Sequence, residues 1–442
     1  MGYIEAPLRP VCPQPRSRTV RVVGAAGFLV YVAALVATNV PTRALLRLRR
    51  ADNRTLAPPV GTSDGRLGAV IGLALALVSG CGTAVGQTQH EASASAVTVS
   101  SPSPGPTLPS PAQCAATGAP SQTPIAESAR PAGVVQATIP IDSGPGAVAV
   151  GFGAIWVAAH RSNTMYRIDP KSNRVGASVV PDIGRDYGMG SITTGSTGVW
   201  LPLSSEPDAL LLIDPMSNRV ESSFDLPGQD PFLRVTWGPG LWAYLSPAPG
   251  RPDKRLVKLD PTTGQVLQTV DLGVGNAAPD RYWPDVVYAF NSLWTVIQDN
   301  ELARVDPSTG TVTAVVKTPG VIEGYGNFAI EGDHLFLAQR DETLVRINSQ
   351  TNCVDGLLFI GAHLPPTPNR TAAQMSVISV GSVLYVAFDR GALAVIDPAS
   401  MRVLKSVRVD FQDYVGAPIS GFGSIWFPTF GNDSVLRLKP LV

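Results

Sequence analysis

The chain has 442 residues, 15% of them charged, and its 34 Lys and Arg balance 34 Asp and Glu. A zero net charge gives no basic surplus for nucleic acid and no acidic surplus for steering cations. The composition, with 43 Gly and 40 Pro, agrees with a secreted globular protein.

The first apolar segment, Val22 to Ala37, has arginines on both sides and could cross a membrane. We instead expect that translation starts later in the chain than Met1. Residues 1–59 would then be an extension that the native protein lacks. A GTG codon reads as Met when it initiates and as Val otherwise, so Val60 is a possible start. N-terminal sequencing of native protein would decide between these readings.

Residues 60–81 resemble a bacterial lipoprotein signal peptide. Arg66 supplies the positive charge, Leu67 to Val78 form an apolar core shorter than a membrane span, and small residues precede Cys81. The alternative is a chance Cys after a short apolar run. The leader predicts a lipid anchor on Cys81 and a place on the outer side of the cytoplasmic membrane of a bacterium.

Residues 82–133 are dominated by Ser, Pro, Ala, Thr and Gly, and we call them the tether. Such a composition cannot bury a core, so an extended, disordered segment is expected. Cys114 lies in the tether and Cys353 lies in the fifth repeat described below. In an oxidising envelope these two could pair or stay free. The four His are isolated in sequence, without Cys/His metal spacing.

An apolar residue followed by Asp and Pro recurs down the remaining chain, with two degenerate copies. The seven second positions are 42 to 49 residues apart: Asp169, Asp214, Asp260, Asp306, Asn348, Asp397 and Lys439. A period of 40 to 50 residues with alternating apolar strands predicts a β-propeller, and seven copies predict seven blades. The fold class expected is all-β, with four-stranded antiparallel blades.

The Asp-Pro motif suits a hairpin turn. The Asp side chain accepts nearby backbone N–H groups, Pro presets φ, and a later Asn or Gly takes the left-handed position, as at Asn173 or Gly264. We favour this reading over a catalytic role for the recurring Asp.

Each repeat also has a large ring in its second strand. Packing between adjacent blades is expected for these rings, in preference to ligand stacking: Trp156, Trp200, Trp242, Trp294, Phe336, Tyr385 and Trp426.

The seventh repeat lacks a fourth strand, and residues 134–141 resemble one. Pairing that segment with the last blade would remove an open sheet edge. The propeller then covers 134–442, about 44 residues per blade.

The string Gly153-Ala154-Ile155-Trp156-Val157, followed by Ile-Asp-Pro, resembles the YVTN-type and streptogramin (virginiamycin B) lyase-like propellers. The resemblance covers all seven repeats. It implies the fold strongly and the activity weakly, because propellers host binding proteins, hydrolases, lyases and scaffolds.

The loops that join one blade to the next are the least repetitive segments, and they should rim the central channel. Aromatic and charged side chains gather in them, so we expect a ligand-binding mouth, against the alternative of capping and solvation. The candidates are Arg185, Asp186, Tyr187, Arg281, Tyr282, Trp283, Asp285, Glu323, Tyr325, His363, Arg370, Asp413 and Tyr414.

Two functions follow from this mouth. The first, preferred, is a non-enzymatic scaffold, expected to be monomeric, that binds an envelope protein, a glycan or a small molecule and needs no cofactor. The second is a hydrolase or a lyase like the streptogramin lyases, which the resemblance implies would use Mg²⁺ for a C–O elimination. A lyase site should gather His and Glu, and His363, Glu323, His160 and Glu206 are the available residues.

Overall fold

The structure is a computed structural model. It describes residues 108–112, 114, 121–122, 134–142, 144–181, 191–203, 209–226, 233–245, 253–274, 285–322, 328–361, 375–388, 391–409 and 416–441. Residues 1–59, the predicted leader and Cys81 lie outside the described residues, so those predictions stay predictions. Within the described ranges no helix has the length and hydrophobicity to cross a bilayer.

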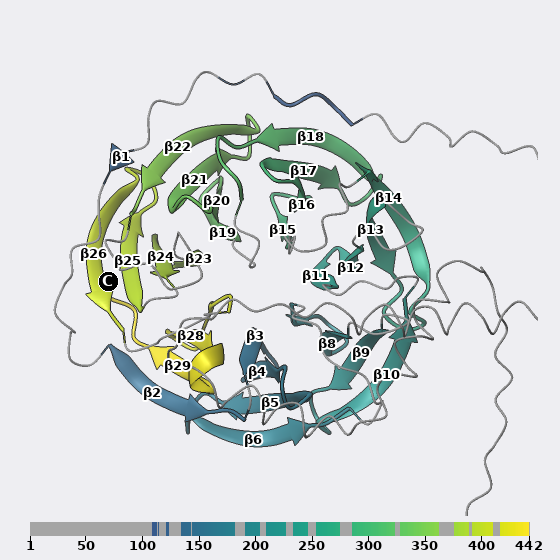
Figure 1. The fold of residues 1–442 in the computed structure, drawn as a ribbon. Helices are drawn as coiled ribbons and strands as arrows, with labels where there is room; N and C mark the ends of the chain where they lie inside the picture. The colour runs from purple at the N-terminus through teal and green to yellow at the C-terminus, as the bar shows by residue number, and fades with distance from the viewer. Residues whose placement is uncertain are drawn as a thin grey trace, which may run out of the picture. The chain divides into compact units, whose positions relative to one another are not determined.

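Seven sheets are arranged in a ring, with the first strand of each innermost (Figure 1). Blade 1 contains β3 (Pro145–Gly151), β4 (Ala154–Ala159), β5 (Thr164–Asp169) and β6 (Arg174–Val179). Blade 2 contains β7 (Thr193–Thr194), β8 (Val199–Leu203), β9 (Ala209–Asp214) and β10 (Arg219–Asp225). Blade 3 contains β11 (Arg234–Gly238), β12 (Gly240–Leu245), β13 (Asp253–Leu259) and β14 (Val266–Val274).

The remaining blades repeat this order. Blade 4 contains β15 (Val286–Ala289), β16 (Ser292–Gln298), β17 (Glu301–Asp306) and β18 (Thr311–Lys317). Blade 5 contains β19 (Phe328–Glu331), β20 (His334–Ala338), β21 (Thr343–Asn348) and β22 (Cys353–Phe359). Blade 6 contains β23 (Met375–Val380), β24 (Val383–Phe388), β25 (Ala392–Asp397) and β26 (Arg402–Arg408). Blade 7 contains β27 (Ile419–Gly421), β28 (Ser424–Thr429), β29 (Ser434–Leu438) and β2 (Val135–Pro140).

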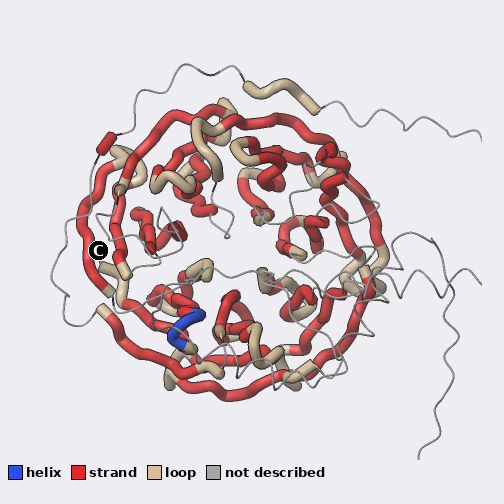
Figure 2. The backbone as a smooth tube through the Cα atoms, in the orientation of Figure 1, coloured by secondary structure: helices blue, strands red, loops and turns tan. Residues whose placement is uncertain are grey.

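Blade 7 is completed by the strand that precedes blade 1, as predicted. β2 pairs antiparallel with β29, from Val135 opposite Leu438 to Pro140 opposite Ser434. Ile139 is buried where the two ends of the ring meet. The seven-bladed, four-stranded architecture is therefore confirmed, and the ring has no unpaired edge at its closure. In the described part of the chain the one helical segment is the single turn η1 (Phe430–Asn432), blue in Figure 2.

The core consists of seven apolar clusters, one between each pair of neighbouring blades. Each cluster contains one of the seven predicted rings together with residues of the next blade. Trp156 packs with blade 2, for example, and Trp426 of blade 7 packs with blade 1. All seven predicted rings are 0 to 1% exposed, which confirms their packing role. Flat rings fill the space between sheets that twist away from each other.

The Asp-Pro turns form one face of the ring together with the turns between first and second strands, and we call it the hairpin face. The Asp169 carboxylate accepts the Lys171 N–H at 2.9 Å and the Ser172 hydroxyl at 2.9 Å. These donors, the Lys171 N–H first, lower the pKa of Asp169. In the degenerate fifth copy Asn348 takes the place of the aspartate, and its side-chain oxygen accepts the Gln350 N–H at 2.8 Å. The aspartates therefore build turns, as expected.

The left-handed position of these turns holds the predicted Asn or Gly in five blades, with φ between 56° and 73°. In blade 6 it holds Met401, at φ 52°, a residue type that the turn rules do not predict. The Met401 side chain is buried in the cluster between blades 5 and 6. Packing with a neighbouring blade therefore offsets the poor backbone preference at this site.

A basic side chain in the third strand links several blades in a way that the repeat pattern had not indicated. Arg304 of blade 4 donates to Ser349 O at 2.7 Å and Asn352 Oδ1 at 2.9 Å, both in the hairpin of blade 5. Its guanidinium also lies over the Trp294 ring, 5.1 Å from the centroid. Arg346 reaches the hairpin of blade 6 in the same manner, through Ala399 O at 2.8 Å.

Part of the tether lies against the outside of the ring, and we call its described residues, 108–112, 114 and 121–122, the belt. Leu108 packs on the cluster between blades 3 and 4, and the Ala112 N–H donates to Val315 O of β18 at 3.2 Å. The short strand β1 (Ser121–Gln122) then adds in parallel to the outer edge of β22, opposite Leu358 and Phe359. An extended, disordered tether was predicted for 82–133. Its described residues instead contact blades 3, 4 and 5.

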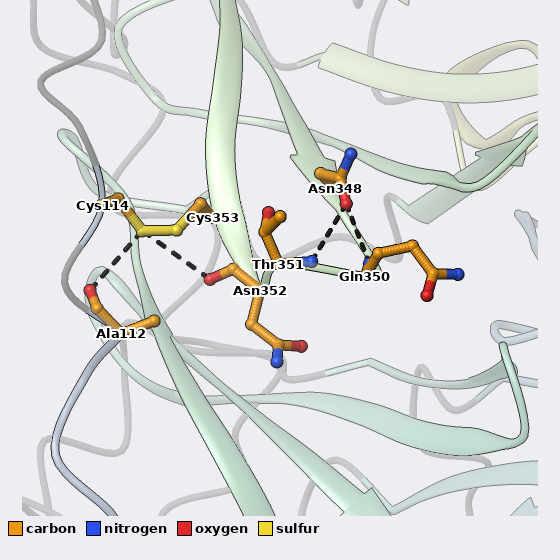
Figure 3. Close-up of a disulfide and its surroundings, with 7 residues drawn as sticks. All are labelled: Ala112, Cys114, Asn348, Gln350, Thr351, Asn352 and Cys353. Atoms are coloured by element: carbon orange, nitrogen blue, oxygen red, sulfur yellow. Dashed lines mark hydrogen bonds between the residues drawn. A yellow bond between two sulfur atoms is a disulfide. The ribbon is translucent and has the colours of Figure 1, made fainter.

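The belt is also bonded covalently to blade 5. Cys114 and Cys353 form a disulfide across 239 residues of sequence, one of the two possibilities that the sequence left open (Figure 3). Cys353 is the first residue of β22, directly after the hairpin of Asn348 to Asn352. The crosslink therefore attaches the belt at the hairpin-face end of the outer strand.

Candidate binding mouth

The opposite face, which we call the loop face, carries the segments between blades and those between second and third strands. Of the thirteen predicted mouth residues, the described part of the chain includes Asp285 alone. The other twelve lie outside it, as does Glu206, so their convergence stays a prediction. What the structure does describe is the base from which several of these segments start.

Asp285 directly precedes β15, the innermost strand of blade 4. Its carboxylate accepts the Val286 N–H at 2.9 Å, and its carbonyl accepts the Thr295 hydroxyl at 2.9 Å. The residue keeps some exposure, yet burial of the carboxyl among protein atoms raises its pKa. The positive charge of Arg234 opposes that shift. Arg234 starts the innermost strand of blade 3 and is 4% exposed.

A second charged group lies between the same two blades. Lys254, on β13, donates from Nζ to the carbonyl of Ile297 on β16. Burial disfavours the ammonium and lowers the pKa of Lys254, while the nearby Asp299 carboxylate opposes the shift. Blades 3 and 4 thus bring two basic and two acidic side chains to the loop face: Arg234, Lys254, Asp285 and Asp299.

The segment from Thr318 to Ile322, between blades 4 and 5, is held by hydrogen bonds along its length. The Thr318 N–H donates to Asn300 O at 2.8 Å, and the Ile322 N–H donates to Asp299 O at 2.7 Å. The Gln339 amide, from blade 5, donates to Gly320 O at 2.9 Å. Glu323 and Tyr325 follow this stem in the sequence. The backbone is therefore held by hydrogen bonds as far as Ile322.

The junction of blades 7 and 1 places His160 at the loop face. Its N–H donates to Gly144 O at 3.1 Å, and its ring lies 6.2 Å from that of Phe430. A Cβ on Gly146 would come within 2.0 Å of His160 Nε2, so the imidazole rests on the backbone of the innermost strand β3. Glycine is required there by this close approach.

Asp433 completes the same junction. It accepts the Gly144 N–H at 2.7 Å and lies 3.8 Å from Arg161 Nη1. Arg161 in turn lies 4.5 Å from the centre of the Phe430 ring. These contacts connect the first and last blades across the closure.

Sequence reasoning missed Arg234, Lys254 and the stem at 318–322. The sequence indicates Arg234 only weakly: Arg234 begins the innermost strand of blade 3, and Asp285 lies at the matching place in blade 4. No sequence pattern indicates Lys254, since its partner is a backbone carbonyl of another blade. Among the described residues no three His, Cys, Asp or Glu side chains are grouped as metal ligands would be.

No protein-family model and no curated protein sequence matches the chain. The virginiamycin B lyase of Staphylococcus aureus resembles it in structure, with a TM-score of 0.54 and 16% identity over 69% of this chain and 99% of that one. A catalytically inactive variant of that lyase, solved with quinupristin, gives 0.54 and 17% over the same shares. BamB of Moraxella catarrhalis gives 0.45 and 11%, over 71% and 98%. The likeness to the lyase shows a shared propeller fold.

Proposed function

We propose that this chain is a cell-envelope lipoprotein whose ring binds an envelope protein, a glycan or a small molecule at the mouth on its loop face. In this proposal Cys81 carries the lipid and holds the protein on the outer side of the cytoplasmic membrane. The ring acts by binding and does not catalyse a reaction.

The observation that carries the proposal is the hydrogen-bonded base of the loop face, from which segments with non-repetitive sequences continue in the chain. The hydrogen-bonded stem at 318–322 precedes Glu323, and Asp285 follows Arg281, Tyr282 and Trp283 in the sequence at the start of an innermost strand. Binding residues are most often placed this way, on loops that a rigid scaffold positions. Arg and aromatic residues are also the types that contribute most to binding.

The compartment is supported by two further features. The Cys114–Cys353 disulfide suits an oxidising environment outside the cytoplasm. The leader-like segment ending at Cys81 would export the chain and lipidate it. A lipid-labelling assay on the native chain and on Cys81→Ala tests the anchor, because the variant should lose the label.

The mouth is tested with the triple variant Arg281→Ala, Tyr282→Ala and Trp283→Ala. We expect an unchanged melting temperature, and a pull-down of envelope proteins or a glycan-array signal weakened by roughly fivefold or more. The matched control, Leu404→Ala with Lys405→Ala on the exposed surface of β26, should bind as the parent does. Equal binding by the triple variant and the parent would refute the mouth.

The alternative proposal, a metal-dependent lyase or hydrolase in the same channel, draws on the fold shared with virginiamycin B lyase and on His160 at the loop face. The full chain with Mg²⁺ is incubated with a cyclic depsipeptide lactone, and ring opening is followed by mass spectrometry. Turnover that Glu323→Ala or His363→Ala abolishes would replace the binding proposal with the lyase. An intact lactone together with ligand binding at the mouth supports the scaffold.

A further inference from the structure

The hairpin face is divided into two chemically different halves. The turns of blades 6, 7, 1 and 2 carry five exposed basic side chains and three aspartates. The basic residues are Arg402, Lys439, Lys171, Arg174 and Arg219, and the acidic ones are Asp397, Asp169 and Asp214. The corresponding turns of blades 3, 4 and 5, all described, contain no Lys or Arg, and they carry Asp260, Asp306 and Asp333. One half of the face is therefore net positive and the other net negative.

Two exposed phenylalanines project from the positive half. Phe152 of blade 1 and Phe422 of blade 7 each follow the last residue of an innermost strand, and they are 41% and 45% exposed. Both have left-handed backbones, with φ of 51° and 53°. The two turns are neighbours, because a Cβ on Gly421 would lie 2.8 Å from the Val150 side chain. Met216, in the Asp-Pro turn of blade 2, is 85% exposed on the same half.

The phenylalanines are not explained by packing or by turn preference. A bulky residue with positive φ is unfavourable, and it persists where something else selects it. Phe290, at the same place in blade 4, packs against the cluster between blades 4 and 5. In blades 5 and 6 the matching turns are Gly332-Asp333 and Gly381-Ser382, which are polar. A Cβ on Gly153 or Gly423 would meet no atom within 4 Å, so the glycine that follows each Phe faces open space.

We propose that the positive half of the hairpin face rests on an anionic lipid surface. Apolar side chains surrounded by Lys and Arg are the combination that binds the headgroup region of a bilayer, with the rings inserted and the cations near lipid phosphates. A water-soluble protein partner would explain the phenylalanines, but it would not by itself explain the basic surplus around them.

This inference rests on the lipid anchor proposed above and adds an orientation to it. A lipid anchor brings the ring to the bilayer without deciding which face lies on it, and the hairpin face would supply a second contact. Residues 82–107 can reach up to roughly 90 Å when extended, so a lipid on Cys81 permits the hairpin face to lie on the membrane. The mouth on the loop face then points away from the bilayer, toward ligands in the envelope.

The contact is tested by fluorescence quenching in the full chain. Phe152→Trp and Phe422→Trp are mixed with vesicles whose acyl chains are brominated, made of phosphatidylcholine alone or with phosphatidylglycerol. The parent, with its seven native Trp, sets the baseline. We expect the added emission to be quenched on the phosphatidylglycerol vesicles and restored by high salt. Thr263→Trp, in the blade 3 turn, is the matched control and should stay unquenched.

Charge reversal tests the electrostatic part. Lys171→Glu with Arg174→Glu should weaken binding to the anionic vesicles by about tenfold or more. Lys317→Glu with Lys405→Glu changes the net charge equally on outer strands away from the turns, and it should weaken binding far less. Equal losses of vesicle binding from both pairs would mean that binding depends on the net charge of the protein and not on this face, and would overturn the proposal.

The proposal is also overturned if neither introduced Trp is quenched on any vesicle, or if Thr263→Trp is quenched as strongly. Crosslinking from position 152 to a protein in cells, without quenching by lipid, would assign the surface to a protein partner instead. Labelling of Cys81 is scored separately. Quenching that persists in a chain without the label supports the membrane face while refuting the anchor.

Discussion

The guanidinium of Arg437, in the last blade, donates a 2.8 Å hydrogen bond to Oδ1 of Asn173, the left-handed residue in the hairpin of the first blade. The same Nη1 donates to Pro170 O at 2.6 Å, and the group lies 5.0 Å from the centre of the Trp426 ring. The closure of the ring thus repeats the contact that joins blade 1 to blade 2, where Arg167 donates to Asn218. The junction of blades 2 and 3 differs. The left-handed turn position of blade 3 holds Gly264, and the matching third-strand position of blade 2 holds Leu212 in place of Arg.

That correspondence predicts a coupled pair. Arg437→Leu should lower the free energy of unfolding by about 1–3 kcal/mol, because charge-assisted hydrogen bonds are lost and Asn173 loses its donor. Asn173→Gly on its own should also destabilise. The double variant copies the Leu212–Gly264 arrangement, so it should cost less than the sum of the two single changes. Urea unfolding of the four proteins measures the coupling, and strict additivity would contradict the pairing.

The strand that closes the ring should be indispensable. Deleting residues 134–141 removes β2 and exposes β29 of blade 7 as an edge, so the melting temperature should fall strongly. Deleting residues 82–107, which precede the belt, should leave the melting temperature unchanged. Differential scanning calorimetry compares the two. Similar melting temperatures for both deletions would contradict the role assigned to β2.

The disulfide should hold the belt on the ring. Cys114→Ser with Cys353→Ser should lower the free energy of unfolding by roughly 2–5 kcal/mol, since the bond closes a long loop in the unfolded chain. Protease cleavage between residues 108 and 122 should become faster. A reducing agent should reproduce both effects in the parent and do nothing further to the double variant. A parent that is insensitive to reduction would argue against the bond.

The pH dependence of stability should distinguish the two kinds of aspartate. The folded protein raises the pKa of Asp285 above its ordinary 3.8, so its favourable contribution is full below that pH and is lost as pH rises through the folded value. The stability of the parent relative to Asp285→Asn should therefore decrease from pH 3.8 toward neutrality. Asp169, whose pKa is lowered, acts in the opposite sense: the stability of the parent relative to Asp169→Asn should be full above pH 3.8 and should be lost as pH falls below that value. Thermal unfolding measured on both sides of pH 3.8 checks both signs.

Much of the architecture was predictable because each repeat carries its own local chemistry. The Asp-Pro turns depend on contacts within six residues, and alternation in each strand marks the side that is buried. The rings such as Trp156 recur at one register, so their burial between blades followed from the period alone. Met401 was not predicted, since its left-handed backbone is offset by packing against another blade.

The candidate mouth was predictable only in outline. Loops that break the repeat pattern indicated where a site should lie, and Asp285 was identified among them. Arg234 and Lys254 were missed because each meets a group from a different blade, more than forty residues away in the sequence. A contact between residues so far apart leaves no pattern in the local sequence.

The number of blades, the turn chemistry and the strand that closes the ring could be predicted from the sequence, because all three follow from a period and from short-range preferences. The fold was needed to show that Arg437 bonds to Asn173, that the belt lies on blades 3 to 5, and that the strands leading to Phe152 and Phe422 are neighbours. These depend on which blades become neighbours, and residues far apart in the chain meet only when the ring has closed.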